Sequence, residues 1–401
     1  MIRSSSRVQR VFGLARATSL ALAVALVGCG EATAPSSTGG TNLTGMAPDL
    51  MPTEIVDPDG TRWIKTGLAR IDAKGPVFRG RQPVTAKSGR NLVADLSVEE
   101  LAQKIRPEME MNGSQYLMDM DSTLALARTM KDLQGQEIQT EGSAPAGPAP
   151  GDLEGRVLGI YDGESRTRVT SNGFPFNTIA FIGGGAGQNT CTGFKLINHH
   201  TIVTAAHCLK DNNDNWRPKP DITFAAGTVG PGLTMPGSCY GRTVPLDWNG
   251  DDDVDLDYGV IRLRGSGAAC DPNAYMWTGF MGTQTIGSCT TTIGLNSAGY
   301  PAKNPDWGAA PPGNWPAPSM FQDYRGNAWT SCPTFPSAVW FENDFSPGMS
   351  GGPLWRFDSS TGNRFVRAIQ VAASEGPFQD TNRGLRFDSG VLAFLRANAG
   401  S

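Results

Sequence analysis

The sequence predicts an all-β fold built from barrels, and two observations carry this prediction. Glycine and proline are abundant, with 50 and 28 residues among 401, while only 18% of the residues are charged. This composition suits a loop-rich β protein better than a helical one. Short apolar runs also recur between clusters of Gly, Pro, Asn and Asp, with the lengths of strands and the spacing of an all-β barrel. The runs are residues 178–182, 201–205, 260–263, 290–293, 338–341 and 365–372.

The start of the chain has the pattern of an exported bacterial protein. Four arginines precede the apolar run 20–27, which is too short to cross a bilayer as a stable helix, so residues 1–29 are predicted to be a secretory signal. The run ends in Val27-Gly28-Cys29 and resembles a lipoprotein box, in which the cysteine is lipidated. An ordinary signal with an incidental cysteine is the alternative. Residues 30–47, rich in Ser, Thr, Gly and Ala, are predicted to be a flexible tether.

Residues 48–136 contain no cysteine or histidine and no constellation suited to chemistry. Ser97 and Glu100 have the spacing of a capping box and predict a helix start, and a second helix is predicted over 121–133. We interpret 48–136 as an α/β or partly disordered propeptide that assists folding or blocks a cleft; a separate binding module is the alternative. The Pro/Ala/Gly-rich residues 137–153 are predicted to be a linker to a catalytic domain spanning 154–401.

The cysteines fit an exported chain. Six remain when Cys29 is set aside, and an even number after a signal peptide predicts disulfides. They are Cys191, Cys208, Cys239, Cys270, Cys289 and Cys332. Cys191–Cys208 is the first predicted pair, because it would tie a strand to the neighbouring segment that carries His207. The pairs Cys239–Cys270 and Cys289–Cys332 follow sequence order alone, and other connectivities stay open.

A candidate nucleophile lies in the stretch 346–354, where Ser350 stands between glycines. Gly348 can turn its peptide so that its N–H and that of Ser350 point at one spot, which is the arrangement an oxyanion requires. Gly351 and Gly352 keep the following turn open to a substrate backbone. The alternative is a glycine-rich surface loop with an incidental serine.

A serine hydroxyl needs a base, and the chain has three histidines, His199, His200 and His207. His207 follows the apolar run 201–203 and is the predicted base, whereas His199 and His200 indicate a solvated turn between two strands. The base needs a carboxylate. Asp257 enters an alternating strand and is predicted for this role, with Asp255 as the fallback.

The chain order His207, Asp257, Ser350 carries fold information, because unrelated triad folds use different orders. With Thr204-Ala205-Ala206-His207-Cys208 and Gly348-Met349-Ser350-Gly351-Gly352-Pro353, the chain resembles the chymotrypsin-fold (trypsin-like) serine peptidases. The likeness is closest to the bacterial glutamyl-endopeptidase-like branch. The stretches behind the branch assignment are Val157-Leu158-Gly159 with Arg166-Thr167-Arg168-Val169, Cys191-Thr192-Gly193-Phe194 and Gly299-Tyr300-Pro301.

The resemblance implies two six-stranded antiparallel barrels, followed by a C-terminal helix for which the apolar spacing of 389–396 is typical. It also implies a serine endopeptidase that works through an acyl-enzyme, with an oxyanion hole at Gly348 and Ser350 and no cofactor. Animal digestive relatives carry an aspartate just before the nucleophile to pair with a new N-terminal amine, but this chain has Met349. Any zymogen control must therefore work otherwise.

The sequence leaves the preference for the P1 residue of the substrate open. The predicted pocket residues are Asp344, Ala373 and Ser374. An aspartate six positions before the nucleophile selects basic P1 residues in trypsin-like enzymes, but one also occurs near there in glutamyl-endopeptidase relatives. Those relatives carry a histidine on the pocket strand, and residues 369–376 contain none. A basic P1 residue therefore stays open, and glutamyl specificity is not carried over.

Composition limits the partners. The net charge is −4, and no basic cluster with interleaved aromatics indicates nucleic acid. No CxxC pair or His/Cys spacing predicts a metal site. The aspartates of 251–255 are interpreted as a solvated loop, because the regular spacing and glycine of an EF-hand are missing, although calcium there stays open.

We expect a monomer that acts on protein or peptide substrates, lipid-anchored at the cell envelope through Cys29 and released by cleavage near Arg156. The alternative function is a catalytically silent surface lipoprotein that uses the fold for binding.

Overall fold

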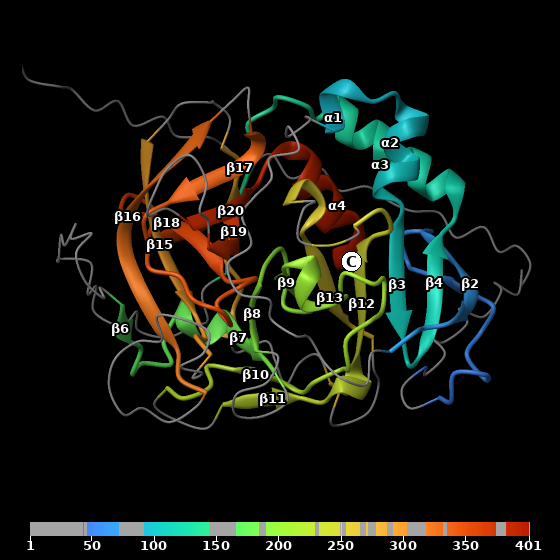
Figure 1. Cartoon of the computed structure of the whole chain (residues 1–401), viewed down its shortest axis with the longest axis horizontal. Coiled ribbons are helices and arrows are strands. Elements are labelled where there is room, and N and C mark those ends of the chain that lie inside the picture. The colour runs from blue at the N-terminus through green and yellow to red at the C-terminus, as the bar shows by residue number, and fades with distance from the viewer. Residues whose placement is uncertain are drawn as a thin grey trace, which may run out of the picture. The chain divides into compact units, whose positions relative to one another are not determined.

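The computed structural model describes residues 43, 46–71, 92–143, 166–183, 190–228, 232–248, 250, 254–264, 270–271, 278–286, 292–302, 318–331, 335–373 and 382–400 (Figure 1). Several predicted features lie outside these residues. They are the signal, Cys29, Arg156, the aspartates 251–253, Cys289, Cys332 and Ser374. Within the described part of the chain, no helix combines the length and the apolar character needed to cross a membrane.

The second half of the chain forms a closed barrel of six strands. Their order is β18-β15-β16-β17-β20-β19, and β19 pairs back with β18, so every strand has two antiparallel neighbours. The strands are β15 (Thr292–Gly299), β16 (Phe321–Ser331), β17 (Phe335–Phe341), β18 (Pro353–Asp358), β19 (Asn363–Ala373) and β20 (Asn382–Arg386). Leu295, Val339 and Leu354 belong to its apolar interior. Closure leaves these six strands without a free edge.

The preceding segment supplies seven strands of a second sheet, in the order β12-β13-β9-β8-β7-β10-β11. The strands are β7 (Ile179–Ile182), β8 (Cys191–Lys195), β9 (Thr201–Thr204), β10 (Ile222–Phe224), β11 (Leu233–Met235), β12 (Tyr240–Pro245) and β13 (Gly259–Leu263). Consecutive members of this path pair antiparallel. All four residues of β7, Ile-Ala-Phe-Ile, are buried, which explains why its apolar run is continuous rather than alternating.

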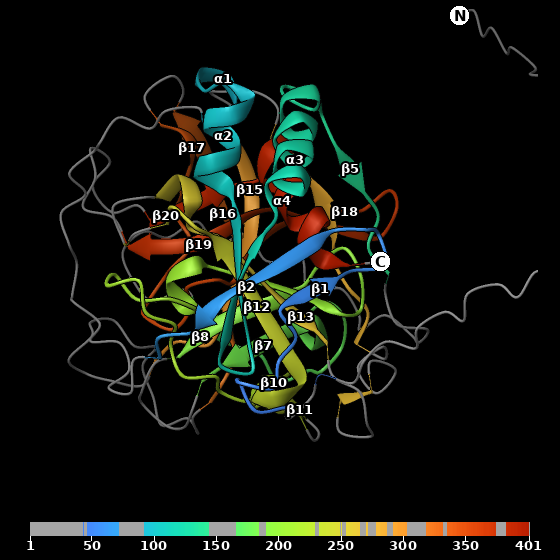
Figure 2. The same cartoon turned by 90° about the vertical axis from the view of Figure 1, so that its right-hand side faces the viewer.

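Residues 46–143, here called the amino-terminal region, extend this sheet instead of standing apart from it. The order continues from β12 through β3, β4 and β2 to β1. The elements are β1 (Glu54–Val56), β2 (Arg62–Leu68), α1 (Leu92–Asp95), α2 (Val98–Ile105), β3 (Pro107–Met111), β4 (Ser114–Met118), α3 (Met120–Asp132) and β5 (Gln139–Thr140). The predicted capping box is present, because Ser97 and Glu100 each bond the backbone N–H of the other. Figure 2 shows the helices beside α4 (Ser389–Ala399).

Short elements complete the chain. Strand β5 lies in the segment predicted as a linker and pairs with β14 (Gly282–Gln284), while β6 (Thr167–Arg168) pairs with β16. Within the described residues there are also four single turns of 3-10 helix, η1 (Phe176–Thr178), η2 (Ala206–Cys208), η3 (Gly237–Cys239) and η4 (Val254–Leu256). Residues 166–400 are here called the barrel domain.

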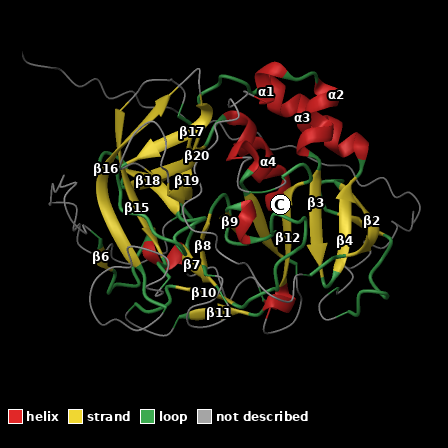
Figure 3. Cartoon of the chain, in the orientation of Figure 1, coloured by secondary structure: helices red, strands yellow, loops and turns green. Residues whose placement is uncertain are grey.

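The predicted chymotrypsin-like all-β class is confirmed, including the terminal helix (Figure 3). The main difference in extent is β15, predicted over 290–293 and found at Thr292–Gly299. Its second half, Asn296 to Gly299, consists of small or polar residues held between neighbouring strands, so it has no apolar signal. The boundary of the predicted propeptide stays a prediction.

Candidate active site

His207 is held in a tight turn directly after β9. Backbone bonds from Cys208 to Ala205 (3.1 Å) and from Lys210 to Ala206 (2.9 Å) close this turn. Arg217 Nε donates to the His207 carbonyl at 2.6 Å from the far side. Hydrogen bonds therefore hold the backbone of His207 in place both within the turn and from Arg217.

Asp257 reaches His207 because their strands are paired. Gly259 of β13 lies opposite Thr204 of β9. Asp257, two positions before Gly259, and His207, three positions after Thr204, therefore meet at the same end of this strand pair. Asp257 Oδ1 accepts the His207 backbone N–H at 2.9 Å, and Oδ2 lies 2.7 Å from Nδ1. Both residues are more than nine-tenths buried.

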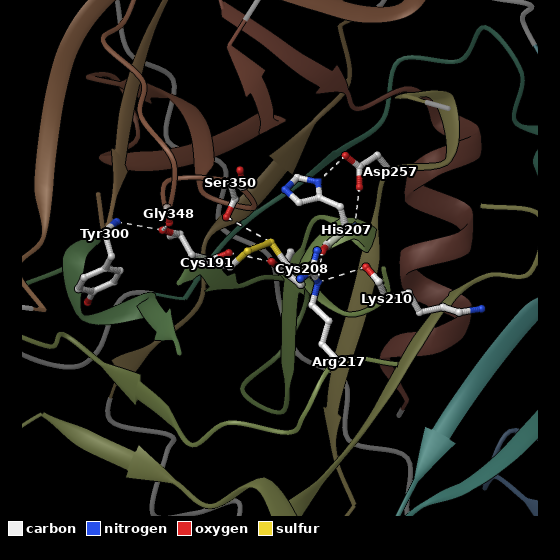
Figure 4. Close-up of a disulfide and its surroundings, with 11 residues drawn as sticks. Cys191, His207, Cys208, Lys210, Arg217, Asp257, Tyr300, Gly348 and Ser350 are labelled. Atoms are coloured by element: carbon white, nitrogen blue, oxygen red, sulfur yellow. Dashed lines mark hydrogen bonds and ion pairs between the residues drawn. A yellow bond between two sulfur atoms is a disulfide. The ribbon is translucent and has the colours of Figure 1, made fainter. Parts of the chain in front are cut away.

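This contact selects one state of the imidazole. A carboxylate accepts hydrogen bonds, so in the neutral imidazole the contact favours the tautomer with the proton on Nδ1 and with Nε2 as the acceptor. In Figure 4 the His207 ring lies between Asp257 and Ser350. Nε2 lies on the side of the ring away from Asp257. It can accept a proton there, as a general base must.

Ser350 is anchored across the two sheets. Its carbonyl accepts the backbone N–H of Thr192 in β8 at 2.8 Å, and the Cys208 sulfur lies 3.6 Å from the same oxygen. Gly351 N–H donates to Gln370 of β19 at 2.7 Å. The loop that carries Ser350 is thus bonded on one side to the histidine sheet and on the other to the closed barrel.

Gly348 adopts a backbone conformation that favours glycine, with φ +93°. The Pro347 carbonyl accepts from Ala302 N at 2.7 Å, and because a trans peptide points its C=O and N–H in opposite directions, Gly348 N–H faces away from Ala302. Among the described residues, none accepts a hydrogen bond from the backbone N–H of Gly348 or Ser350. Two N–H donors are therefore available to a developing oxyanion.

Arg166 is a site residue that the sequence did not reveal. Its buried guanidinium donates to Ser346 Oγ at 2.7 Å and lies 3.4 Å from the sulfur of Met349. A cation thus contacts the loop that carries Ser350, in a chain that has Met349 where digestive relatives have aspartate. In the sequence Arg166 belongs only to a family-like stretch, and no local pattern marks it as buried.

The disulfides Cys191–Cys208 and Cys239–Cys270 are present, as predicted. The first ties β8 to the His207 turn (Figure 4). Among the described residues, one group of three potential metal ligands was found, formed by His207 with Cys191 and Cys208. The two sulfurs are bonded to each other, whereas a metal is bound by a thiolate, so this disulfide does not supply a metal site.

The remaining predicted residues lie as follows. His199 and His200 form the turn between β8 and β9, but they are half-buried rather than fully solvated, and the His199 ring packs edge-on against Phe280. Asp255 lies in η4, and it is Asp257 whose carboxylate meets His207 Nδ1. Asp344 is half-buried, and its N–H donates to Asp323 Oδ2 at 2.8 Å. Ala373 ends β19.

Residues 191–363 match the family model of the trypsin-like peptidase domain. The chain is also 26% identical over 245 residues to an extracellular metalloprotease of Bacillus subtilis (strain 168). The aligned region covers 58% of this chain and 67% of that protein. The matched residues include His207, Asp257 and Ser350. These matches support a chymotrypsin-fold peptidase; the glutamyl-endopeptidase-like branch stays a prediction.

Two solved structures are similar at 19% sequence identity. The protease Anisep from Arthrobacter nicotinovorans matches 58% of this chain and 98% of its own with a TM-score of 0.40. The thermostable serine protease AL20 from an extremophilic microorganism matches 55% of this chain and 97% of its own with a TM-score of 0.38.

Proposed function

We propose that this protein is a serine endopeptidase in which Ser350 is the nucleophile, His207 the general base and Asp257 its partner. The observation that carries the proposal is the double contact of Asp257 with the His207 backbone and ring, on the side of the imidazole opposite Ser350. This contact leaves Nε2 unprotonated, which is what activation of a hydroxyl requires.

The proposed reaction has two halves. Ser350 Oγ attacks the substrate carbonyl as its proton moves to His207 Nε2, and the N–H groups of Gly348 and Ser350 stabilise the oxyanion. His207 then donates this proton to the leaving amine, which departs and leaves an acyl-enzyme. Water then attacks the acyl carbon as His207 takes its proton. The bond between the acyl carbon and Ser350 Oγ breaks, His207 returns the proton to Oγ, and the carboxylic acid product leaves. Asp257 stabilises the imidazolium in both halves.

Covalent labelling distinguishes this proposal from the alternative, a catalytically silent surface lipoprotein that uses the fold for binding. A fluorophosphonate should label the wild-type protein and not the Ser350→Ala variant, with the rate falling sharply in His207→Ala. Ser360→Ala is a matched control, because Ser360 lies in an exposed turn, and its labelling rate should equal that of the wild type. Equal labelling of Ser350→Ala, or no labelling of the wild type, would contradict serine catalysis.

The P1 preference belongs to the same proposal. Asp344 favours a basic P1 residue, and the pocket strand offers no histidine for a substrate carboxylate. A peptide library should therefore show cleavage after Arg or Lys that is weakened at least tenfold by Asp344→Ser. Preference for Glu at P1 would contradict this assignment.

Export and lipid anchoring of Cys29 complete the proposal, supported by the sequence pattern alone. Wild-type protein expressed in a bacterium should partition with the membrane fraction and carry a lipid mass on Cys29. The Cys29→Ser variant should not. Wild-type protein recovered without the lipid mass would contradict the anchor.

A further inference from the structure

The amino-terminal region meets the barrel domain through strand pairing. Strand β3 pairs antiparallel with β12, matching Pro107 with Pro245 and Glu110 with Arg242. The other side of β12 pairs with β13. Without β3, one edge of β12 would present unpaired backbone groups, which folded proteins normally cover.

Carboxylates of the amino-terminal region meet cations of the barrel domain along this junction. Glu108 Oε2 lies 2.6 Å from Lys210 Nζ, and the two side chains are 1% and 0% exposed. Glu110 Oε2 accepts from Arg242 Nε at 2.9 Å, with both side chains at most 2% exposed, and lies 3.3 Å from Lys219 Nζ. In each pair the acid comes from one segment and the base from the other.

A third carboxylate repeats the arrangement further along the sheet. Both oxygens of Asp57 accept from Arg264, at 2.8 and 2.9 Å, and Arg262 reaches Oδ2 at 2.9 Å. Burial alone would raise the pKa of Asp57, but these guanidinium groups lower it below its ordinary value. Burial likewise opposes ionisation of Glu110, and Arg242 with Lys219 again lowers its pKa. Separation of the two segments would break these ion pairs.

The two segments also share one apolar core. Leu101 and Ile105 of α2 and Met130 of α3 belong to the same buried cluster as Leu392 of α4 and apolar residues of β7, β8, β9 and β13. A Cβ on Gly390 would lie 2.6 Å from Val93, so α4 is packed closely against the amino-terminal region. Asn42–Ser401 accordingly form one compact unit.

The junction reaches the candidate active site through Lys210, three residues after His207. In Figure 4 the Lys210 side chain points away from the imidazole, toward the strands of the amino-terminal region. Its backbone N–H closes the His207 turn, and its carbonyl accepts from Arg217 Nε at 3.2 Å, the same atom that holds the His207 carbonyl. Glu108 thus holds the side chain of a residue whose backbone shapes that turn.

We propose that the amino-terminal region is a permanent partner of the barrel domain: it stays bound after the chain is cut between residues 143 and 166, and its Glu108 is a positioning residue for His207. The first part is independent of activity, and the second rests on the proposed serine peptidase function. A cut at this place therefore leaves the barrel domain attached to the amino-terminal region and to whatever that region is anchored to.

The binding part is tested in the full chain with Ser350→Ala, which removes self-cleavage. A recognition site for a sequence-specific protease is inserted between residues 143 and 166, the chain is cut, and the products are examined by native mass spectrometry and gel filtration. The expected result is a 1:1 complex that withstands high salt, because its charges are buried. Two soluble fragments that separate in native buffer would overturn the proposal, whether or not the protein is a peptidase.

Substitutions then test the junction itself. In the cut chain, Glu108→Gln with Glu110→Gln should weaken the complex at least tenfold, measured as dissociation after dilution. Glu99→Gln is the matched control, since Glu99 is exposed on α2, and it should leave the complex unchanged. Equal dissociation rates for the double variant and for Glu99→Gln would show that the buried ion pairs do not hold the amino-terminal region on the barrel domain.

The positioning part is tested in active, uncut enzyme at a temperature well below unfolding. Glu108→Gln should lower kcat at least fivefold with KM within twofold. Adding Lys210→Met should cause little further loss, because the other ion pair of Lys210, with Asp214, lies at the surface. Where Glu108→Gln alone does not fold, the double variant, which removes both charges, is measured by the same criteria. Activity within twofold of wild type in the folded variant would overturn the positioning role. Wild-type protein that fails to label with fluorophosphonate would instead overturn the proposed function, leaving the binding result intact.

Discussion

Replacement of Gly348 by alanine is a direct test of the oxyanion geometry. A Cβ at this position would lie 2.4 Å from the Tyr300 carbonyl oxygen, 2.7 Å from Ala302 N and 2.7 Å from Thr190 Oγ1. The first two are backbone atoms, and Ala302 N is itself bonded to the Pro347 carbonyl at 2.7 Å. These backbone atoms cannot move without a large cost in free energy, so the Pro347–Gly348 peptide must rotate.

Rotation would turn the Gly348 N–H away from the oxyanion and remove one of two donors. Loss of a single donor of this kind costs about 10²- to 10³-fold in kcat, or roughly 3–4 kcal/mol. The positive φ adds about 1–2 kcal/mol of backbone strain, which acts on stability. We therefore expect Gly348→Ala to lower kcat by at least about 10²-fold, with KM changed much less.

The assay is steady-state cleavage of a fluorogenic peptide chosen from the P1 library, with thermal unfolding measured on the same samples. Gly362→Ala is the matched control, because Gly362 also has a positive φ, +73°, but nothing lies within 4 Å of the added Cβ. The control should lose stability and keep its kcat. A Gly348→Ala enzyme whose kcat stays within threefold of wild type would refute the assigned oxyanion hole.

Three further predictions concern the groups around this site and one buried lysine. Asp257→Asn should lower kcat about 10⁴-fold near pH 7, because an amide facing Nδ1 favours the wrong tautomer of His207; a pH-independent loss below tenfold would contradict the assigned role. Arg166→Met should lower kcat by about 10- to 100-fold by loosening the nucleophile loop, whereas Arg168→Met, at an exposed site, should not; similar activity of both variants would contradict the anchoring role. Burial lowers the pKa of Lys195 to about 7, so the folded state binds fewer protons than the unfolded chain between pH 7 and 10.5, and this cost to stability is full below pH 7 and fades as pH rises. Lys195→Met should therefore raise the free energy of unfolding by up to about 5 kcal/mol at pH 6 and by much less at pH 10, measured in urea; an equal change at both pH values would contradict this origin.

The parts of the molecule that could be predicted are those with local signals. The glycines around Ser350, the capping box of Ser97 and Glu100 and the apolar strand before His207 each depend on residues a few positions apart. Such patterns report turn chemistry and side-chain alternation directly. The Asp257 position followed from the entry of its strand, and the strand pairing of β9 with β13 brings it to His207.

Strand β3 illustrates what could not be predicted. Pro107-Glu-Met-Glu-Met alternates polar and apolar residues, which is typical of a strand with one face in solvent. In the structure all five residues are buried. The two glutamates face Lys210 and Arg242, more than a hundred positions later in the chain, and no local pattern announces partners at that distance.

The sequence by itself indicated the β class, the Cys191–Cys208 pair and the residues proposed for catalysis, because their signals are local motifs along the chain. The structure decided that Cys239 pairs with Cys270, which sequence order alone had left open. Only the tertiary structure decided that the amino-terminal region continues the sheet of β7 to β13 and that Arg166 contacts the loop that carries Ser350. The physical reason is that the buried charges at these places are stabilised by an opposite charge or a hydrogen-bond partner from a distant part of the chain. That meeting is a property of the folded chain, and the linear pattern does not contain it.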